Sequence, residues 1–251
     1  MSYYETERAL SEYLLLHFGA AEQLLPYDFG PSDALHFPVR CVNECLDTGR
    51  LPAEARALDL GCAVGRATFE LAVHCAHVQG IDSSHALISA ARRLQQHGAI
   101  DFSYAEEGEL LIPARAVVPP AINRQRVAFE QGDAQDLPSS LAAFDAVLMA
   151  NLIDRLPEPR RCLEQLPRLL KPGGQLILTS PYTWSNEFTP RENWLGGFER
   201  GGARVRTLDT LTEILSPQFE LAARKDMPFL IREHARKFQW CVAQATVWIR
   251  R

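Results

Sequence analysis

The chain has 251 residues, of which 47% are hydrophobic and 23% charged, and its formal net charge at pH 7 is -5. This length and composition suit one sizeable α/β core with a small cap and argue against a second full domain. The negative net charge argues against a protein that binds nucleic acid through its phosphates, because such a protein needs a surface dense in positive charge.

The first 52 residues are predicted to form helices and turns ahead of the sheet. Apolar residues recur at near-helical intervals over residues 5–18, and a turn-rich segment at 26–38 leads to a second helix at 39–47. Gly49 and Pro52 end that helix before the first strand. We therefore predict an N-terminal helical cap over residues 1–52, in a position to act as a lid.

An apolar run at residues 55–60 carries an acid near its end and then breaks into glycines. Asp59 precedes Gly61, and Gly65 follows after three further residues. A dinucleotide-binding loop would instead have Gly-x-Gly-x-x-Gly, whose glycines let a pyrophosphate approach a helix N-terminus. The pattern predicts a strand that leads to a nucleoside site without phosphate, where the Asp59 carboxylate holds a cationic amino group or a ribose.

Two further strands are predicted to end in acids. After an apolar helix at 68–76, a strand at 78–82 ends at Asp82, where an acid suits a ribose diol. A third strand at 127–129 leads to Asp133, placed to hydrogen-bond the amino group of an adenine. Residues 101–124 break the periodicity just where that strand is due, so we expect an insertion there, as a short hairpin.

The second half of the chain is predicted to complete an α/β fold with 1–251 as one domain. The run at 144–151 is almost continuously apolar, as in a parallel strand that is buried on both faces. We expect a seven-stranded, mostly parallel sheet with an antiparallel last strand and helices on both faces. The remaining predicted elements are helices at 84–97, 159–170 and 208–215 and strands at 175–180, 219–226 and 241–249.

This series of strand-end acids resembles the class I S-adenosylmethionine-dependent methyltransferases, which have a Rossmann-like fold. The middle glycine of their usual loop is Ala63 here, a small departure. A doubly wound domain whose glycines only serve turns, or one that binds a nicotinamide cofactor, is the alternative. The resemblance implies S-adenosylmethionine as cofactor and S-adenosylhomocysteine as product. The predicted cofactor-binding residues are Asp59, Gly61, Cys62, Ala63, Gly65, Asp82, Ser83, Asp133, Ala134, Gln135 and Asn151.

Aromatic and charged residues after the later strands are predicted to form the acceptor site. Tyr182 and Trp184 suit the wall of a pocket for a flat ring, or else pack beneath a surface loop. Arg232 suits a carboxylate, Glu233 an ammonium and His234 a moving proton, or else all three only solvate a turn. The predicted catalytic residues are Asn151, Tyr182 and His234, and the predicted acceptor-binding residues are Tyr4, Phe37, Arg40, Tyr182, Trp184, Arg232 and Glu233.

Six blocks of sequence resemble the 5-thiohistidine N-methyltransferases of ovothiol biosynthesis, and the resemblance runs from Tyr3 to Arg251. It implies methylation of an imidazole ring nitrogen of 5-thiohistidine to give ovothiol A. In many organisms that domain is fused behind a sulfoxide synthase, so a functional link to such an enzyme is expected. A methyltransferase for another small amino acid or amine, or a regulator that binds the cofactor without turnover, is the alternative. The blocks are residues 3–5, 35–40, 151–156, 180–184, 194–197 and 228–234.

The six cysteines form no Cys-x-x-Cys pair, and the histidines other than His234 have no metal-ligand spacing, which favours a structural role for each of them. The sequence therefore predicts no metal site and no disulfide framework, and reduced thiols indicate a cytoplasmic protein. The first seven residues include acids where a signal peptide needs basic residues, and no apolar run reaches the length of a membrane span. We expect a protein that acts on a small molecule without binding a membrane.

Overall fold

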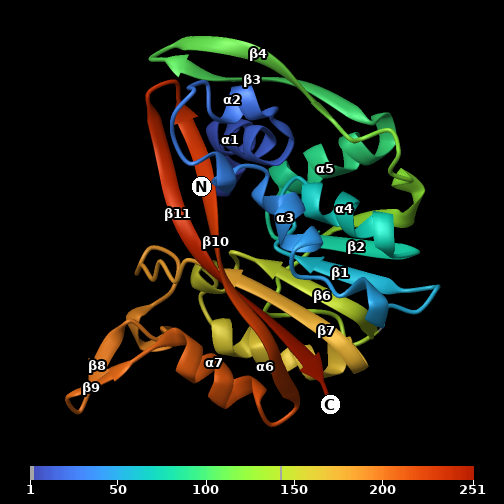
Figure 1. The fold of residues 1–251 in the computed structure, drawn as a ribbon, viewed down its shortest axis with the longest axis vertical. Helices are drawn as coiled ribbons and strands as arrows, with labels where there is room; N and C mark the ends of the chain where they lie inside the picture. Colours follow the sequence, from blue (N-terminus) through green and yellow to red (C-terminus); the bar gives the residue numbers. More distant parts are fainter. Residues whose placement is uncertain (1–2, 142) are drawn as a thin grey trace.

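The computed structural model of the protein describes residues 3–141 and 143–251, so residues 1 and 2 of the predicted cap lie outside the described part. Its centre is a seven-stranded sheet in the order β10-β11-β7-β6-β1-β2-β5 (Figure 1). The sheet is parallel except around β11, which is antiparallel to both of its neighbours. The predicted fold class is confirmed. The strands are β1 (Arg56–Leu60), β2 (His77–Asp82), β5 (Val127–Gln131), β6 (Phe144–Ala150), β7 (Leu170–Ser180), β10 (Phe219–His234) and β11 (Lys237–Arg250).

Helices cover both faces of this sheet (Figure 1). Because successive strand residues point to opposite faces, Leu58 and Leu60 of β1 pack into the core on one face, whereas Asp59 points to the other. The face of Asp59 carries α3 (Phe37–Asn43), α4 (Arg66–His74) and α5 (His85–His97), and the face of Leu58 carries α6 (Pro159–Leu169) and α7 (Thr207–Leu215).

The strand order places a ligand crevice beside β1. β1 pairs in parallel with β2 on one side and with β6 on the other. The chain therefore winds away from β1 in both directions, and an open α/β sheet binds its ligand outside the carboxyl ends of the strands at such a point. The loops that follow Leu60, Asp82 and Ala150 meet at this edge.

The last two strands are longer than the sequence predicted. β10 continues to His234 and β11 begins at Lys237, beyond the predicted strands at 219–226 and 241–249, so the turn between them is confined to Ala235 and Arg236. The extension lies beside the N-terminal helices (Figure 1). The charged residues at 232–237 suggested that the strand ends earlier. Arg232 among them is instead buried against distant parts of the chain.

The N-terminal segment packs between this extension and α4 and α5 (Figure 1). Its longest helix is capped by Thr6, whose hydroxyl accepts the N–H of Ala9 at 3.1 Å. Besides α3, the segment contains η1 (Tyr3–Glu5), α1 (Glu7–Phe18), α2 (Ala21–Leu24), η2 (Ser32–Ala34) and η3 (Thr48–Arg50).

A two-stranded hairpin follows α5, in the region where the sequence predicted an insertion. β3 (Ala99–Glu107) pairs antiparallel with β4 (Leu110–Val117), and the N–H of Ala235 donates to the carbonyl of Glu106, which joins the hairpin to the turn between β10 and β11. The remaining short elements are η4 (Arg124–Arg126), η5 (Ile153–Arg155), η6 (Arg191–Asn193), β8 (Phe198–Arg200) and β9 (Ala203–Val205).

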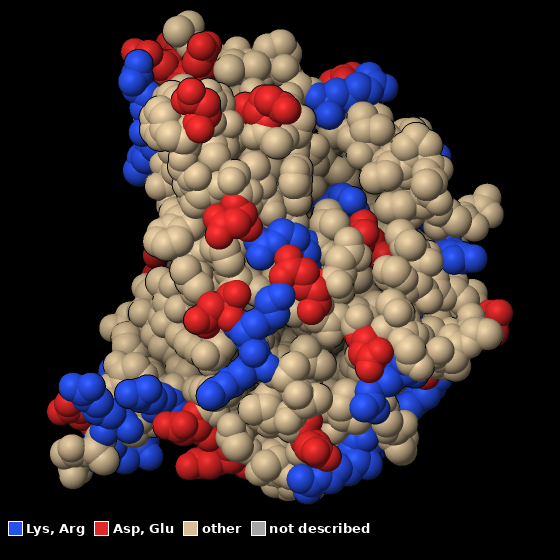
Figure 2. All heavy atoms as spheres, viewed as in Figure 1, with Lys and Arg blue, Asp and Glu red and all other residues tan. Residues whose placement is uncertain are grey.

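The surface carries charges of both signs. On the face in Figure 2, Lys and Arg side chains lie interspersed with Asp and Glu rather than in one extended basic patch. In the described part of the chain, none of the helices is both long enough and apolar enough to cross a membrane.

Candidate active site

A cavity of about 180 Å³ lies at the carboxyl ends of β1, β2 and β6. Its base is formed by the loops after these strands, its roof by the N-terminal cap and one wall by β10. The residues that line it are Tyr4, Tyr13, Leu16, His17, Phe37, Pro38, Asp59, Gly61, Cys62, Ala63, Ala67, Asp82, Ser83, Leu87, Ala150, Asn151, Leu152, Arg155, Leu156, Pro181, Phe229 and Ile231.

The loop after β1 is held in a left-handed conformation. The φ angles of Gly61, Ala63 and Gly65 are 74°, 49° and 87°, a region that residues with a Cβ rarely adopt. A Cβ on Gly65 would lie 2.4 Å from the ring of Phe129. Gly65 therefore serves close packing at the start of α4 and does not line the cavity, whereas Gly61 and Ala63 do.

Two carboxylates lie at the base of the cavity. Asp59 Oδ2 accepts the hydroxyl of Thr68 at 2.7 Å, and burial raises the pKa of Asp59 to about 7. Asp82 accepts the N–H of Ala63 on one oxygen and the N–H of Ser84 on the other, both at 2.9 Å, and burial raises its pKa as well. Both groups retain lone pairs that suit a ligand ammonium or hydroxyl.

Asn151 turns the chain at the end of β6. Its φ is 52°, its N–H donates to the carbonyl of Thr179 at 2.9 Å, and its Oδ1 accepts the hydroxyl of Thr179 at 3.0 Å. These contacts leave the Asn151 Nδ2 group as a donor beside the cavity.

The cap is fixed to the N-termini of two helices around the cavity. The Glu5 carboxylate accepts the N–H groups of His85 and Ala86 at the start of α5, at 2.8 and 3.3 Å. His17 Nδ1 accepts the N–H of Arg66 at the start of α4 at 3.3 Å. Burial lowers the pKa of His17 to about 3, so the ring is neutral and its proton is on Nε2.

Thirteen of the residues that line this cavity are not among the predicted site residues, and they include Tyr13, His17, Arg155, Phe229 and Ile231. Tyr13 and His17 are four positions apart on α1 and so lie on one face of the helix, although the sequence favoured a structural role for His17. Phe229 and Ile231 alternate along β10, and Arg155 follows Asn151 within the loop after β6. The spacings are visible in the sequence, but their direction toward the ligand depends on tertiary packing.

Three residues of the predicted acceptor site, Arg232, Glu233 and His234, lie outside the cavity. Because side chains alternate along a strand, Arg232 points away from the face of Ile231. The Arg232 Nη1 donates to the carbonyl of Gln23 at 2.6 Å, and its guanidinium lies 5.0 Å from the ring of Tyr104. Glu233 forms ion pairs with Arg8 and Lys237, and His234 Nδ1 accepts the N–H of Arg236.

Three more predicted acceptor residues also make contacts elsewhere. Arg40 donates to Glu44 and to the carbonyl of Pro228, and so joins α3 to β10. The Tyr182 hydroxyl donates to Gln244 Oε1 at 3.0 Å, and Trp184 donates to Thr207 while stacking on Trp194. The two aromatic residues therefore support the loop after β7, which contributes Pro181 to the cavity.

The predicted adenine residues are not part of the cavity lining, although they follow β5, the neighbour of β2. Asp133 Oδ1 accepts the N–H of Gln135 at 2.8 Å, and Gln135 Oε1 accepts the N–H of Glu158 at 2.6 Å. The side chains of Asp133 and Gln135 are thus engaged in contacts within this turn and with Glu158.

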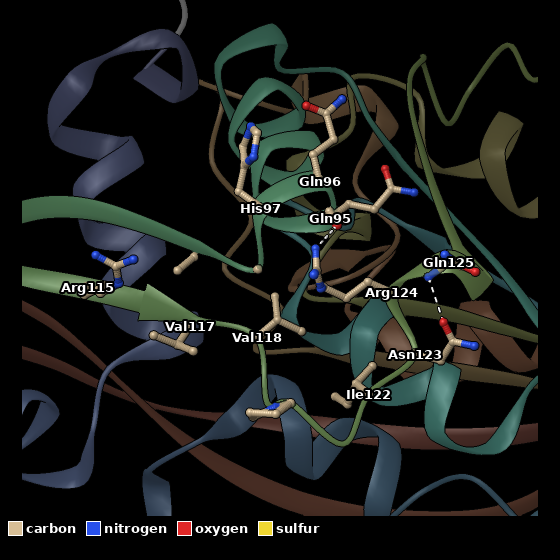
Figure 3. A pocket seen from close by; sticks show the side chains of 13 residues that line it. Gln95, Gln96, His97, Arg115, Val117, Val118, Ile122, Asn123, Arg124 and Gln125 are labelled. Carbon is tan, nitrogen blue, oxygen red and sulfur yellow. Dashed lines mark hydrogen bonds between the residues drawn. The ribbon is translucent and has the colours of Figure 1, made fainter.

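A second and larger pocket, of about 990 Å³, lies at the base of the β3–β4 hairpin (Figure 3). The Arg124 side chain crosses it and donates to the carbonyl of Gln95, while Asn123 accepts the N–H of Gln125. The pocket shares no residue with the cavity at the strand ends. Its position away from the carboxyl ends of the strands separates it from the candidate active site.

Comparisons with known proteins agree with this geometry. Two family profiles, both described as a methyltransferase domain, match residues 58–178 and 122–245. The chain is 30% identical over 126 residues to a demethylmenaquinone methyltransferase of Clavibacter sepedonicus, which covers 50% of this chain and 41% of that protein. It is 28% identical over 154 residues to a ubiquinone biosynthesis O-methyltransferase of Xanthomonas axonopodis, covering 60% and 53%.

The chain therefore spans about half the length of the curated relatives that it matches. Among solved structures, a SAM-dependent methyltransferase of Methanosarcina mazei aligns with a TM-score of 0.55 at 19% identity, covering 80% of this chain and 95% of that one. This likeness shows the fold.

Proposed function

The chain belongs to the class I S-adenosylmethionine-dependent methyltransferases, and we propose that it methylates a ring nitrogen of 5-thiohistidine to give ovothiol A. The cofactor of this superfamily is S-adenosylmethionine, which when bound supplies an electrophilic methyl group on a sulfonium. The acceptor is the new element of the proposal, since the relatives are named for quinone methylation.

The base of the cavity fits the cofactor. Asp59 is a buried carboxyl whose raised pKa would return toward its ordinary value beside an ammonium, and the methionine portion of the cofactor carries one. Asp82 has lone pairs for the two ribose hydroxyls. We assign Asp133 and Gln135 to the adenine, and the Gly61 and Ala63 loop to the methionine and ribose portions.

The observation that carries the acceptor proposal is the set of aromatic rings that line the roof and the β10 wall of the cavity. Tyr4 and Tyr13 meet edge to face with centroids 6.0 Å apart, and the rings of Phe37 and Phe229 are tilted relative to each other with centroids 4.9 Å apart. All four line the cavity. Aromatic walls suit a flat ring such as the imidazole of 5-thiohistidine.

Alignment is the main task of the protein in such a reaction. Holding the acceptor nitrogen in line with the methyl group can lower the barrier by about 7 to 11 kcal/mol in favourable cases. The imidazole nitrogen already has a lone pair, and the thiolate enriches the ring in electrons, so the released proton can pass to water without a strong base. The roof must orient the ring so that the thiolate sulfur, which is a softer nucleophile than the ring nitrogen, lies away from the methyl group.

Product analysis tests this proposal. The purified chain is incubated with S-adenosylmethionine and 5-thiohistidine, and the product is examined by NMR. A new N-methyl signal on the ring is the expected result, with histidine and a catechol as comparison acceptors. S-methylation, or turnover of the catechol but not of 5-thiohistidine, would overturn the proposal. Asp82→Ala serves as the control for turnover that depends on the cofactor site.

A further inference from the structure

Arg155 is the one Arg or Lys side chain among the described residues that line the cavity. It ends η5 in the loop after β6, four positions beyond Asn151. The two carboxylates of the lining, Asp59 and Asp82, belong to the cofactor half. Arg155 therefore supplies the positive charge of the acceptor half.

The guanidinium of Arg155 is held at one nitrogen only. Its Nη1 donates to the carbonyl of Asp154 at 3.0 Å, to Asp154 Oδ2 at 3.1 Å and to the carbonyl of Thr183 at 3.1 Å. Its carbon centre lies 4.9 Å from the ring centroid of Phe188. The protein thus fixes the plane of the guanidinium through Nη1. Among the described residues no hydrogen bond of standard geometry is made by Nε or Nη2, and the Tyr4 phenol interacts with the same guanidinium.

These two nitrogens form one edge of the guanidinium, with two parallel N–H groups that match a carboxylate. The Arg155 side chain is 27% exposed. In the described part of the chain, the buried polar atoms without a partner are Asp154 Oδ1 and Arg232 Nε, so the free nitrogens of Arg155 are accessible. The free edge is therefore a preformed fork beside the cavity.

Asp154 determines how this fork recognises an anion. It is fully buried, and its Oδ2 also accepts the N–H of Thr183 at 2.9 Å, so its position is fixed. Its charge offsets part of the charge of Arg155. Recognition then depends more on the two parallel donors than on net charge, and a lysine ammonium cannot reproduce that geometry.

We infer that Arg155 binds the α-carboxylate of the acceptor through this edge, which makes the acceptor a free amino acid. The inference rests on the proposed function and replaces the role that the sequence predicted for Arg232. Tyr4 lies beside the same group: burial raises the pKa of its phenol, and Arg155 opposes that rise. The acceptor ring then lies against the roof while its carboxylate lies at η5.

A change to the substrate tests the role of Arg155 and leaves the protein, and therefore its folding, unaltered. The parent protein is assayed with 5-thiohistidine and with the same compound lacking the carboxylate, a thiolated histamine. We expect the Michaelis constant of the thiolated histamine to be at least about tenfold higher, the lower end of what a hydrogen bond to a charged group supplies. Equal Michaelis constants would overturn the inference while leaving the proposed function intact. Methylation of neither compound would instead refute the proposed function.

Variants of Arg155 supply the second measurement. In Arg155→Lys and Arg155→Gln the Michaelis constant of the amino acid should rise to that of the thiolated histamine, so that the two acceptors become equivalent, while affinity for S-adenosylhomocysteine stays near that of the parent. Arg161→Lys, on the exposed face of α6, is the matched control and should keep the parent preference. If Arg155→Gln retained the preference for the carboxylate, Arg155 would have only a structural role.

Discussion

Ala63 and Asp82 are joined by a hydrogen bond of 2.9 Å in which the N–H of Ala63 donates to Asp82 Oδ2. The bond ties the loop after β1 to the end of β2. One carboxylate therefore shapes the backbone of the loop after β1 and also faces the cavity, so changes at either residue should alter ligand affinity.

Replacing Asp82 with Ala should weaken binding of S-adenosylhomocysteine by roughly 1.5 to 3 kcal/mol, the range for hydrogen bonds to a charged group. Titration calorimetry measures the change, and circular dichroism establishes that the variant is folded. Glu130→Gln, at the exposed edge strand, is the control. An unchanged affinity in folded Asp82→Ala would remove Asp82 from the cofactor site.

Replacing Ala63 with Val should reduce cofactor affinity and lower the melting temperature. A β-branched side chain is strained at the φ of 49° found here, and its added methyl groups enter the cavity. Ala63→Gly is the matched control, because glycine adopts this conformation freely. If Ala63→Val bound S-adenosylhomocysteine as tightly as Ala63→Gly, the loop would not contact the ligand.

Cofactor affinity should depend on pH through Asp59. Its pKa of about 7 means that the carboxyl is increasingly protonated below that pH, whereas an ammonium partner requires the carboxylate. Binding then releases a proton, and affinity should fall as the pH falls below 7, by at most about tenfold per unit for one proton. His17 does not contribute over this range, because its pKa of about 3 keeps it neutral.

The check is calorimetry of S-adenosylhomocysteine binding from mildly acidic to mildly alkaline pH in buffers of different ionisation enthalpy, which reports proton release. Asp59→Asn should bind more weakly and show a flat profile. A slope that persisted in Asp59→Asn would assign the titration to another group.

The cap should open to admit the cofactor. The cavity of about 180 Å³ is below the roughly 300–1,000 Å³ of typical small-molecule pockets. Glu5 fixes the cap to the N-terminus of α5, where a carboxylate contributes about 0.3 to 1 kcal/mol. Glu5→Gln should therefore increase hydrogen exchange in residues 7–18 of the free protein, and S-adenosylhomocysteine should reduce it. Glu7→Gln, on the exposed side of α1, should have little effect.

The fold could be predicted from the sequence because local patterns determine it. Continuous apolar runs identified the buried parallel strands, and the acids at or next to the ends of β1 and β2 located the carboxyl edge of the sheet. The sequence also grouped the candidate cofactor residues Asp59, Asp82 and Asn151, which line one cavity because each lies at or next to the carboxyl end of a strand.

The part of the cavity that we propose for the acceptor could not be predicted in the same way. Its walls come from α1, α3 and β10, which meet only in the folded chain. Arg232 illustrates the difficulty: a charged residue near a turn indicates solvent, yet it is 4% exposed because Gln23 and Tyr104 cover it. Arg155 was overlooked because nothing in its neighbours reveals that one edge of its side chain stays free.

The extension of β10 has a consequence for how such enzymes can diversify. Phe229 and Ile231 come from near one end of the chain and Tyr4, Tyr13 and Phe37 from the other, while the cofactor residues lie between positions 59 and 151. Under the proposed function, the aromatic and aliphatic residues that would contact the acceptor and the residues that would hold the methyl donor thus lie in separate stretches, with Arg155 just after the second set. Exchanging the two terminal stretches and the residue at position 155 together, as a matched set, should therefore change the substrate preference while the residues between positions 59 and 151 stay unaltered.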